Sequence, residues 1–194
     1  YRSLWDGSKL LSRNNKEYNA PEWFTKSLPK DMHLDGEIWI DRYSFQEVGK
    51  IRKKIPTNDE WSNISYLLYD IPSLNIPFSE RYSKLKLIIK EIEQNWENYK
   101  SSLPEPFNSL KCPIKITPQI LIKSLDQFNN LYNKIINNGG EGLIIKHPDS
   151  LYERKRSDFM LKVKPDFDAE AIIIDYKKGT GKYEGKLGSF ICNP

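Results

Sequence analysis

Residues 159–165 read FMLKVKP, and this short stretch is the most informative part of the chain. As a β-strand it would place Lys162 and Lys164 on one face and Leu161 and Val163 on the other, because side chains alternate along a strand. Two neighbouring lysines repel each other unless an anion lies between them. The pattern fits either an edge strand with two solvated lysines or a strand that binds a polyphosphate.

The composition is that of a globular protein, with 38% hydrophobic and 29% charged residues. No apolar run is long enough to cross a membrane, so no membrane partner is expected. The absence of a secretory signal favours an intracellular location, although the compartment itself stays unknown. A net charge of +4 is compatible with a polyanionic partner. Cys112 and Cys192 are far apart, which makes a disulfide framework or a zinc site unexpected.

Hydrophobic periodicity predicts an α+β fold. The clearest helix is Glu80–Lys100, where apolar residues recur every three or four positions. A second helix should begin at the capping box Ser124–Gln127 and end at Gly139. Asp6-Gly7 predicts the tight turn of a hairpin over 3–12, and Pro21 a short helix. Further strands are expected at 34–40, 64–71, 114–119, 141–146, 169–176 and 187–192.

Two carboxylates lie among apolar strand residues. Glu37 and Glu141 would each be unfavourable if buried alone. Convergence with Lys162 and Lys164 would relieve that cost, either by mutual ion pairing or by holding a divalent metal and a nucleotide phosphate together. Tyr69, at the end of a strand, fits a place in the core or a stacking contact with a base.

Short motifs follow one another along the whole chain. They are Arg2, SRN (12–14), LDGE (34–37), YLLYD (66–70), GEGLI (140–144) and LKVK (161–164). Between and after them come WDG (5–7), APEWF (20–24), DSLY (149–152) and GKYEGKLGS (181–189). In this order the motifs resemble those of the ATP-dependent DNA ligases, within the covalent nucleotidyltransferase superfamily, and most closely the minimal ligases of bacteria and viruses.

The resemblance implies a nucleotidyltransferase fold of the α+β class, ATP-grasp-like, with two antiparallel sheets flanked by helices. Residues 1–165 would form the nucleotidyltransferase (adenylation) domain without its N-terminal part. Residues 166–194 would begin an OB-fold domain, which is incomplete because an OB barrel has five strands. The chain is therefore expected to be a fragment, truncated at both ends.

The resemblance also implies a nucleotide-binding set. Arg2 would contact the ribose, and Arg13 a phosphate of the nucleotide or of the nick. Glu37 would bind the ribose hydroxyl or act through the metal. Tyr69 would stack on adenine.

Three further residues would carry the chemistry. Glu141 would hold the catalytic divalent ion, Mg²⁺ or Mn²⁺, with Glu37 as the second metal-binding candidate. Lys162 and Lys164 would grip the α-phosphate and stabilise its charge during transfer.

The nucleophile of the family is the lysine of a Lys-x-Asp-Gly-x-Arg motif. If Arg2 ends that motif, the lysine is expected four residues before Tyr1. Asp6-Gly7 and Asp35-Gly36 have no lysine at the required spacing, because Leu4 and His33 stand there. The expectation is that this chain alone cannot adenylate itself.

The implied function is ATP-dependent sealing of nicks through enzyme-adenylate and DNA-adenylate intermediates. Its partner would be nicked double-stranded DNA, its state a monomer, and its setting DNA replication, repair or recombination. The same motif types also occur in RNA ligases and mRNA-capping nucleotidyltransferases. A non-catalytic remnant that only binds nucleotide or nucleic acid is a third possibility.

Overall fold

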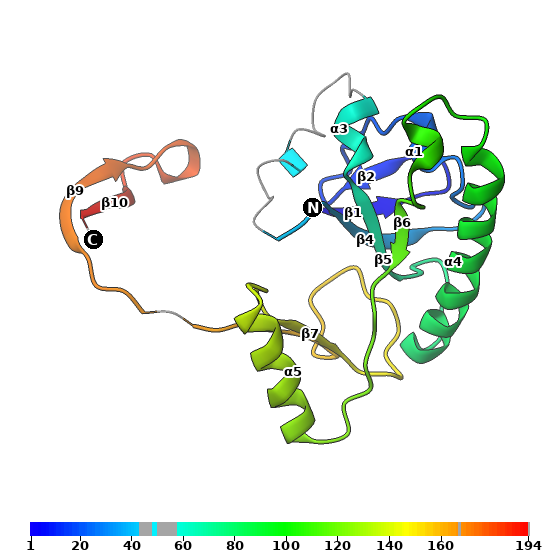
Figure 1. The fold of residues 1–194 in the computed structure, drawn as a ribbon. Helices are drawn as coiled ribbons and strands as arrows, with labels where there is room; N and C mark the ends of the chain where they lie inside the picture. Colours follow the sequence, from blue (N-terminus) through cyan, green and yellow to red (C-terminus); the bar gives the residue numbers. More distant parts are fainter. Residues whose placement is uncertain (43–47, 50–57, 167, 194) are drawn as a thin grey trace. The chain divides into compact units, whose positions relative to one another are not determined.

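The computed structural model describes residues 1–42, 48–49, 58–166 and 168–193. The chain divides into two compact units, Tyr1–Val163 and Lys164–Pro194 (Figure 1). This division falls two residues before the boundary expected at 165.

The first unit is built on a six-stranded sheet of order β3-β2-β1-β4-β5-β6. All neighbours are antiparallel except β5 and β6, which are parallel. The parallel pair differs from the expected all-antiparallel arrangement. Strands β5 and β6 run in the same direction because the long connection through helix α4 returns the chain to the end of the sheet at which β5 begins. The α+β class is confirmed. The strands are β1 (Arg2–Trp5), β2 (Leu10–Ser12), β3 (Glu17–Tyr18), β4 (Leu34–Trp39), β5 (Ser65–Asp70) and β6 (Ile114–Ile116).

Helix α4 (Phe78–Lys100) packs against β5 and β6. Its predicted periodicity is confirmed, since Leu85, Ile89, Ile92 and Trp96 are buried. The helix begins two residues earlier than expected, after Pro77. The shorter helical segments of this unit are α1 (Glu22–Thr25), α3 (Asn58–Ser62) and the 3₁₀ turn η2 (Phe107–Ser109).

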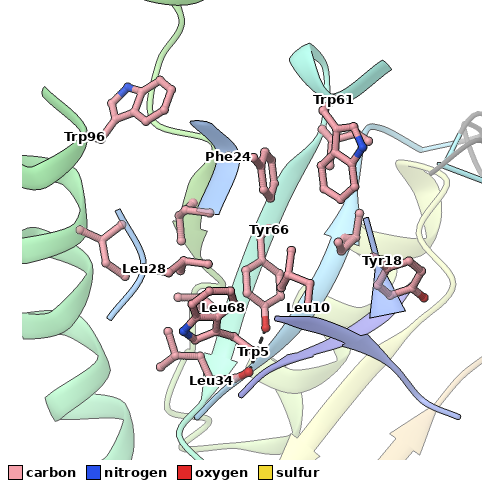
Figure 2. Packing of buried hydrophobic residues seen from close by; sticks show 14 of the residues in the cluster. Trp5, Leu10, Tyr18, Phe24, Leu28, Leu34, Trp61, Tyr66, Leu68 and Trp96 are labelled. Carbon is pink, nitrogen blue, oxygen red and sulfur yellow. Dashed lines mark hydrogen bonds between the residues drawn. The ribbon is translucent and has the colours of Figure 1, made fainter. Parts of the chain in front are cut away.

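Aromatic side chains pack among leucine and isoleucine side chains in the core of the first unit (Figure 2). The ring centroids of Phe24 and Trp61 are 4.7 Å apart in an edge contact, and those of Trp23 and Trp96 are 6.1 Å apart. The hydroxyl of Tyr66 lies 2.9 Å from two backbone carbonyl oxygens, which belong to Ser3 and Leu34. Through this buried hydroxyl, a side chain of β5 contacts the backbone of both β1 and β4.

The predicted hairpin is confirmed, but its two central residues are Gly7 and Ser8 rather than Asp6 and Gly7. The amide of Asp6 donates to the carbonyl of Lys9 at 3.1 Å, and Gly7 has a φ of +98°. The Asp6 carboxylate accepts from the amides of Ser8 and Lys9, at 2.8 and 2.7 Å. Burial opposes ionisation of Asp6, but these hydrogen bonds outweigh it and lower its pKa.

Helix α5 (Leu125–Asn137) has no buried residues. Ser124 Oγ accepts from the amide of Gln127 at 3.1 Å, as the capping box predicts. In a capping box the Gln127 side chain would accept from the amide of Ser124. Here it accepts from the amide of Lys123, at 2.8 Å. The helix gives way to Gly139, whose φ is +74°.

A two-stranded antiparallel sheet completes the first unit. β7 (Leu143–Lys146) and β8 (Met160–Val163) pair with Ile144 opposite Lys162. β7 begins after Gly142, whose φ of +142° interrupts the strand expected from 141.

The second unit contains β9 (Ile172–Lys178) and β10 (Leu187–Asn193), which are antiparallel, with the 3₁₀ turn η3 (Gly181–Tyr183) between them. Both strands were predicted, although β9 starts and ends later than expected. Among the described residues, no helix combines the length and the apolar character needed to cross a membrane.

Gly36→Ala is expected to destabilise the first unit by about 1–3 kcal/mol, because over-packing a dense interior forces its surroundings to move. A Cβ at Gly36 would lie 2.6 Å from both the Leu67 carbonyl oxygen and a ring carbon of Tyr66. Urea denaturation followed by tryptophan fluorescence measures the change. Lys90→Ala, on the exposed face of α4, is the control and should stay within about 0.5 kcal/mol of the parent.

Candidate functional site

A surface hollow of about 330 Å³ lies between β4 and the β7–β8 sheet. This volume is within the range typical of ligand sites. Its lining includes three predicted site residues, Glu37, Glu141 and Lys162, together with Gly142, Leu143 and Ile144. The structure therefore brings together side chains from three strands or their ends, while their roles remain predictions.

Glu141 and Lys162 form an ion pair, with 3.0 Å between Oε2 and Nζ. Their side chains are 87% and 52% exposed, so the expectation that Glu141 is buried is wrong. Glu141 lies before β7 on the rim of the hollow, and its apolar neighbours in sequence do not cover it. An exposed pair contributes at most about 1 kcal/mol, so a ligand could open it at little cost.

Glu37 is also more exposed than expected, with 41% of its side chain accessible. It lies opposite Arg2 in the β1–β4 ladder. One of its carboxylate oxygens lies 2.5 Å from the amino group of Tyr1. Glu37 thus faces the hollow from the main sheet, across from the strands that carry the other two residues.

Arg2 and Tyr69 meet at Asp35, a buried residue that the sequence reasoning did not single out. The Arg2 guanidinium donates to both Asp35 oxygens, at 3.2 and 2.8 Å. The Tyr69 hydroxyl donates to Oδ1 at 3.2 Å, and the Tyr152 hydroxyl to Oδ2 at 2.7 Å. Asp35 is 1% exposed, so these donors compensate its burial.

This network shifts the pKa of each of its donors. The hydrogen bond to Asp35 raises the pKa of Arg2 despite partial burial. Burial, followed by the charge of Asp35, raises the pKa of both Tyr69 and Tyr152. All three donors therefore keep their protons over the physiological range, and the network is stable there.

Tyr69 does not line the hollow. Its hydroxyl is bonded to Asp35, and Lys146 Nζ lies 5.5 Å from the centroid of its ring. The prediction that this ring stacks on adenine is not tested by the arrangement.

A second buried cluster joins the two sheets. Asp70, at the end of β5, accepts from Arg81 Nε at 2.6 Å and from Lys146 Nζ at 2.7 Å. Their side chains are 1%, 2% and 12% exposed, respectively. Burial alone would raise the pKa of Asp70, but the two cations outweigh it and lower the pKa. Because Lys146 ends β7, this cluster fastens one wall of the hollow to the main sheet.

The segment after β7 caps helix α4. The amides of Phe78 and Ser79, in its first turn, donate to the carbonyls of Ser150 and Pro148 at 2.9 and 2.8 Å. Arg81 Nη1 also donates to the Ser150 carbonyl, at 3.0 Å. These bonds satisfy amides that a helix start leaves free, and they hold the chain where Tyr152 reaches Asp35.

Four predicted residues are not part of this lining: Arg2 and Tyr69, which meet at Asp35, and Arg13 and Lys164. Arg13 is exposed just beyond β2, and Lys164 is the first residue of the second unit. Their predicted contacts with phosphate stay predictions.

The donors present fit a divalent cation of the magnesium type, which prefers one or two carboxylates together with substrate phosphates. Glu37 and Glu141 supply that pair at the hollow. In the part of the chain that the structure describes, no group of three or more His, Cys, Asp or Glu residues could hold a metal. Phosphate oxygens and water would complete the coordination.

Comparison with known proteins identifies relatives over nearly the whole chain. The family model described as "ATP dependent DNA ligase domain" matches residues 5–164. The DNA ligase of Haemophilus influenzae is 29% identical over 98% of this chain, which spans 64% of that protein's length.

Solved structures give the same result. A structure from the study of Lig E DNA ligases titled "DNA binding with a minimal scaffold" has a TM-score of 0.76 and 30% identity, over 98% of this chain and 68% of the other. The ATP-dependent DNA ligase of bacteriophage T7, in complex with ATP, has a TM-score of 0.61 at 19% identity, over 98% of this chain and 70% of the other, which shows the fold alone. Because the family model covers most of the sequence, this chain belongs to the ATP-dependent DNA ligase family.

Proposed function

We propose that this chain binds ATP in the hollow between β4 and the β7–β8 sheet, as part of an enzyme that seals nicks in duplex DNA. The observation that carries the proposal is the convergence of Glu37, Glu141 and Lys162 on one hollow of nucleotide size. Family membership supports the use of ATP, and the relatives named above are DNA ligases.

When the nucleotide binds, the ion pair between Glu141 and Lys162 would open, and each side chain would contact the ligand instead. The ammonium of Lys162 would turn to the α-phosphate. The resemblance to the ligases assigns Lys164 to the same phosphate, where it would add a second positive charge. Glu141 and Glu37 would hold Mg²⁺ or Mn²⁺, which neutralises the phosphates of ATP.

The remaining contacts would orient the nucleotide. Arg2, held by Asp35, would reach the ribose, and Tyr69 would stack on adenine with its hydroxyl fixed by the same carboxylate. Arg13 would contact a phosphate of the nucleotide or of the nick. In the complete enzyme AMP would pass from a lysine to the 5′-phosphate of the nick, and the 3′-hydroxyl would then displace it.

We also propose that residues 1–165 form the adenylation domain and that residues 166–194 open an OB-fold domain. The two antiparallel strands β9 and β10 support the second assignment.

Glu141→Ala tests the proposal directly. Wild-type chain should bind ATP with Mg²⁺ by isothermal titration calorimetry, and the variant should bind at least about tenfold more weakly, because it loses a metal ligand. Glu97→Ala, on the exposed face of α4, removes the same charge and should change nothing. Unaltered affinity in Glu141→Ala would reject the site. Competition between ATP and GTP, and between nicked DNA and RNA ends, separates a DNA ligase from an RNA ligase or a capping enzyme.

Binding to nicked duplex DNA is expected to be dominated by phosphates and independent of sequence. Each phosphate contact releases counterions, so affinity should fall steeply as salt rises, by about 10³ or more between 50 and 200 mM if about six contacts form. Fluorescence anisotropy with a labelled nicked duplex measures this dependence. A flat salt response would contradict the expected interface.

A further inference from the structure

The position of Glu141 is not set by its own packing. Its side chain is 87% exposed, and its ion pair is with a half-exposed lysine. Gly140 precedes it and Gly142 follows it, and neither has a side chain that could pack to hold this segment. What holds this carboxylate on the rim of the hollow must act on the backbone just before it, at the end of α5.

Arg42 contacts the backbone at the end of α5. Its Nη1 donates to the carbonyls of Asn138 at 2.6 Å and Ile135 at 3.2 Å, both at the C-terminal end of α5. The Ile135 carbonyl also accepts from the amide of Gly140, at 2.8 Å. A guanidinium is well suited to this place, because helix carbonyls are unpaired there and the end of a helix carries partial negative charge.

The guanidinium also lies directly against Gly140. A Cβ at Gly140 would be 2.9 Å from Arg42 Nη1 and 2.5 Å from a methyl carbon of Ile135. Since α5 has no buried residue, packing of its side chains does little to fix its end. The close contacts of Gly140 with Arg42 and Ile135 fix the end of this helix instead.

We propose that Arg42 is a positioning residue for Glu141. Arg42 lies five residues after Glu37 of β4, and its side chain bonds the end of α5 three residues before Glu141. The distance between the two carboxylates then depends on the bonds from Arg42 to the end of α5. The consequence for the nucleotide rests on the proposed function, whereas the consequence for the backbone does not.

Arg42→Met keeps much of the aliphatic length and removes the donors. We expect faster amide hydrogen exchange at residues 138–142 and about tenfold weaker Mg²⁺-dependent ATP binding, the usual result of removing a support of a metal ligand. Arg42→Lys should recover part of both, because an ammonium lacks the planar fork that reaches two carbonyls together. Lys90→Met, which removes an exposed charge on α4, should match the wild type in both measurements.

Gly140→Ala disturbs the same contact from the other side. Since its added methyl would displace the guanidinium, the loss of ATP affinity in the Arg42→Met/Gly140→Ala double variant should be well below the sum of the two single losses. Additive losses would overturn the proposal.

The two levels of the proposal fail in different ways. A wild-type chain that does not bind ATP would reject the proposed function, and hydrogen exchange would still test the role of Arg42 in the backbone. Unchanged exchange in Arg42→Met would overturn that role. Faster exchange with unaltered ATP affinity would overturn the link to Glu141. Melting temperatures of all variants show whether the fold is retained.

Discussion

Asp70→Asn is expected to lower the free energy of unfolding of the first unit by about 3–5 kcal/mol, because it leaves two buried cations without their counter-charge. Arg81 and Lys146 both bond this carboxylate, and all three side chains are at most 12% exposed. Urea denaturation followed by tryptophan fluorescence reports on this unit alone, since all five tryptophans lie within residues 1–163.

Glu97→Gln is the matched control for Asp70→Asn. It removes the carboxylate of an exposed pair with Lys100 on the same helix and should cost less than about 1 kcal/mol. An equally small cost for Asp70→Asn would contradict the proposed coupling of the two sheets.

Acid provides a second test of Asp70. Its folded-state pKa is lowered below 3.8, so its contribution is present above that pH and is lost as pH falls through the folded value. The wild type should therefore lose stability more steeply than Asp70→Asn below pH 3.8.

Alkaline pH is expected to destabilise the first unit by about 3 kcal/mol per pH unit above pH 10. Burial raises the pKa of Tyr66 and Tyr69 well above 10.0, whereas both ionise near that value once unfolded. Their stabilisation is therefore complete below pH 10 and decreases as pH rises, by about 1.4 kcal/mol per pH unit for each proton that only the folded state keeps. The pKa of Tyr152 is also raised, but Tyr152 is partly exposed, so the expected 3 kcal/mol per pH unit comes from Tyr66 and Tyr69.

Denaturation between pH 9 and 12, with tyrosinate absorbance recorded in parallel, measures this effect. Buried Tyr66 and half-buried Tyr69 should ionise only with unfolding. Tyr69→Phe should reduce the pH slope by about half, whatever it does to stability at neutral pH. A variant with the wild-type slope would show that the network around Asp35 does not hold this proton.

The two buried clusters also bear on the proposed site. Asp35 lies under the ribose-binding candidate Arg2, and Asp70 anchors the end of β7. Neither Asp35 nor Asp70 lines the hollow. Substitutions at these positions are therefore expected to affect nucleotide binding indirectly, by moving the strands that form its walls.

Local patterns in the sequence were sufficient for the two long helices, for most of the strands and for the family. The 3.6-residue period of α4 and the cap at Ser124 each report contacts within a few residues, so they survive in the folded chain. The order of the motifs identified the ligase family without any knowledge of their spatial arrangement.

Long-range contacts were beyond such patterns. Lys146 and Asp70 are 76 residues apart, Arg42 and Asn138 are 96 apart, and Tyr152 and Asp35 are 117 apart. No periodicity links residues at these separations, so the supporting side chains were missed and the exposure of Glu141 was misjudged. Burial depends on what the rest of the chain places over a side chain, and that becomes defined only when the sheets and helices pack together.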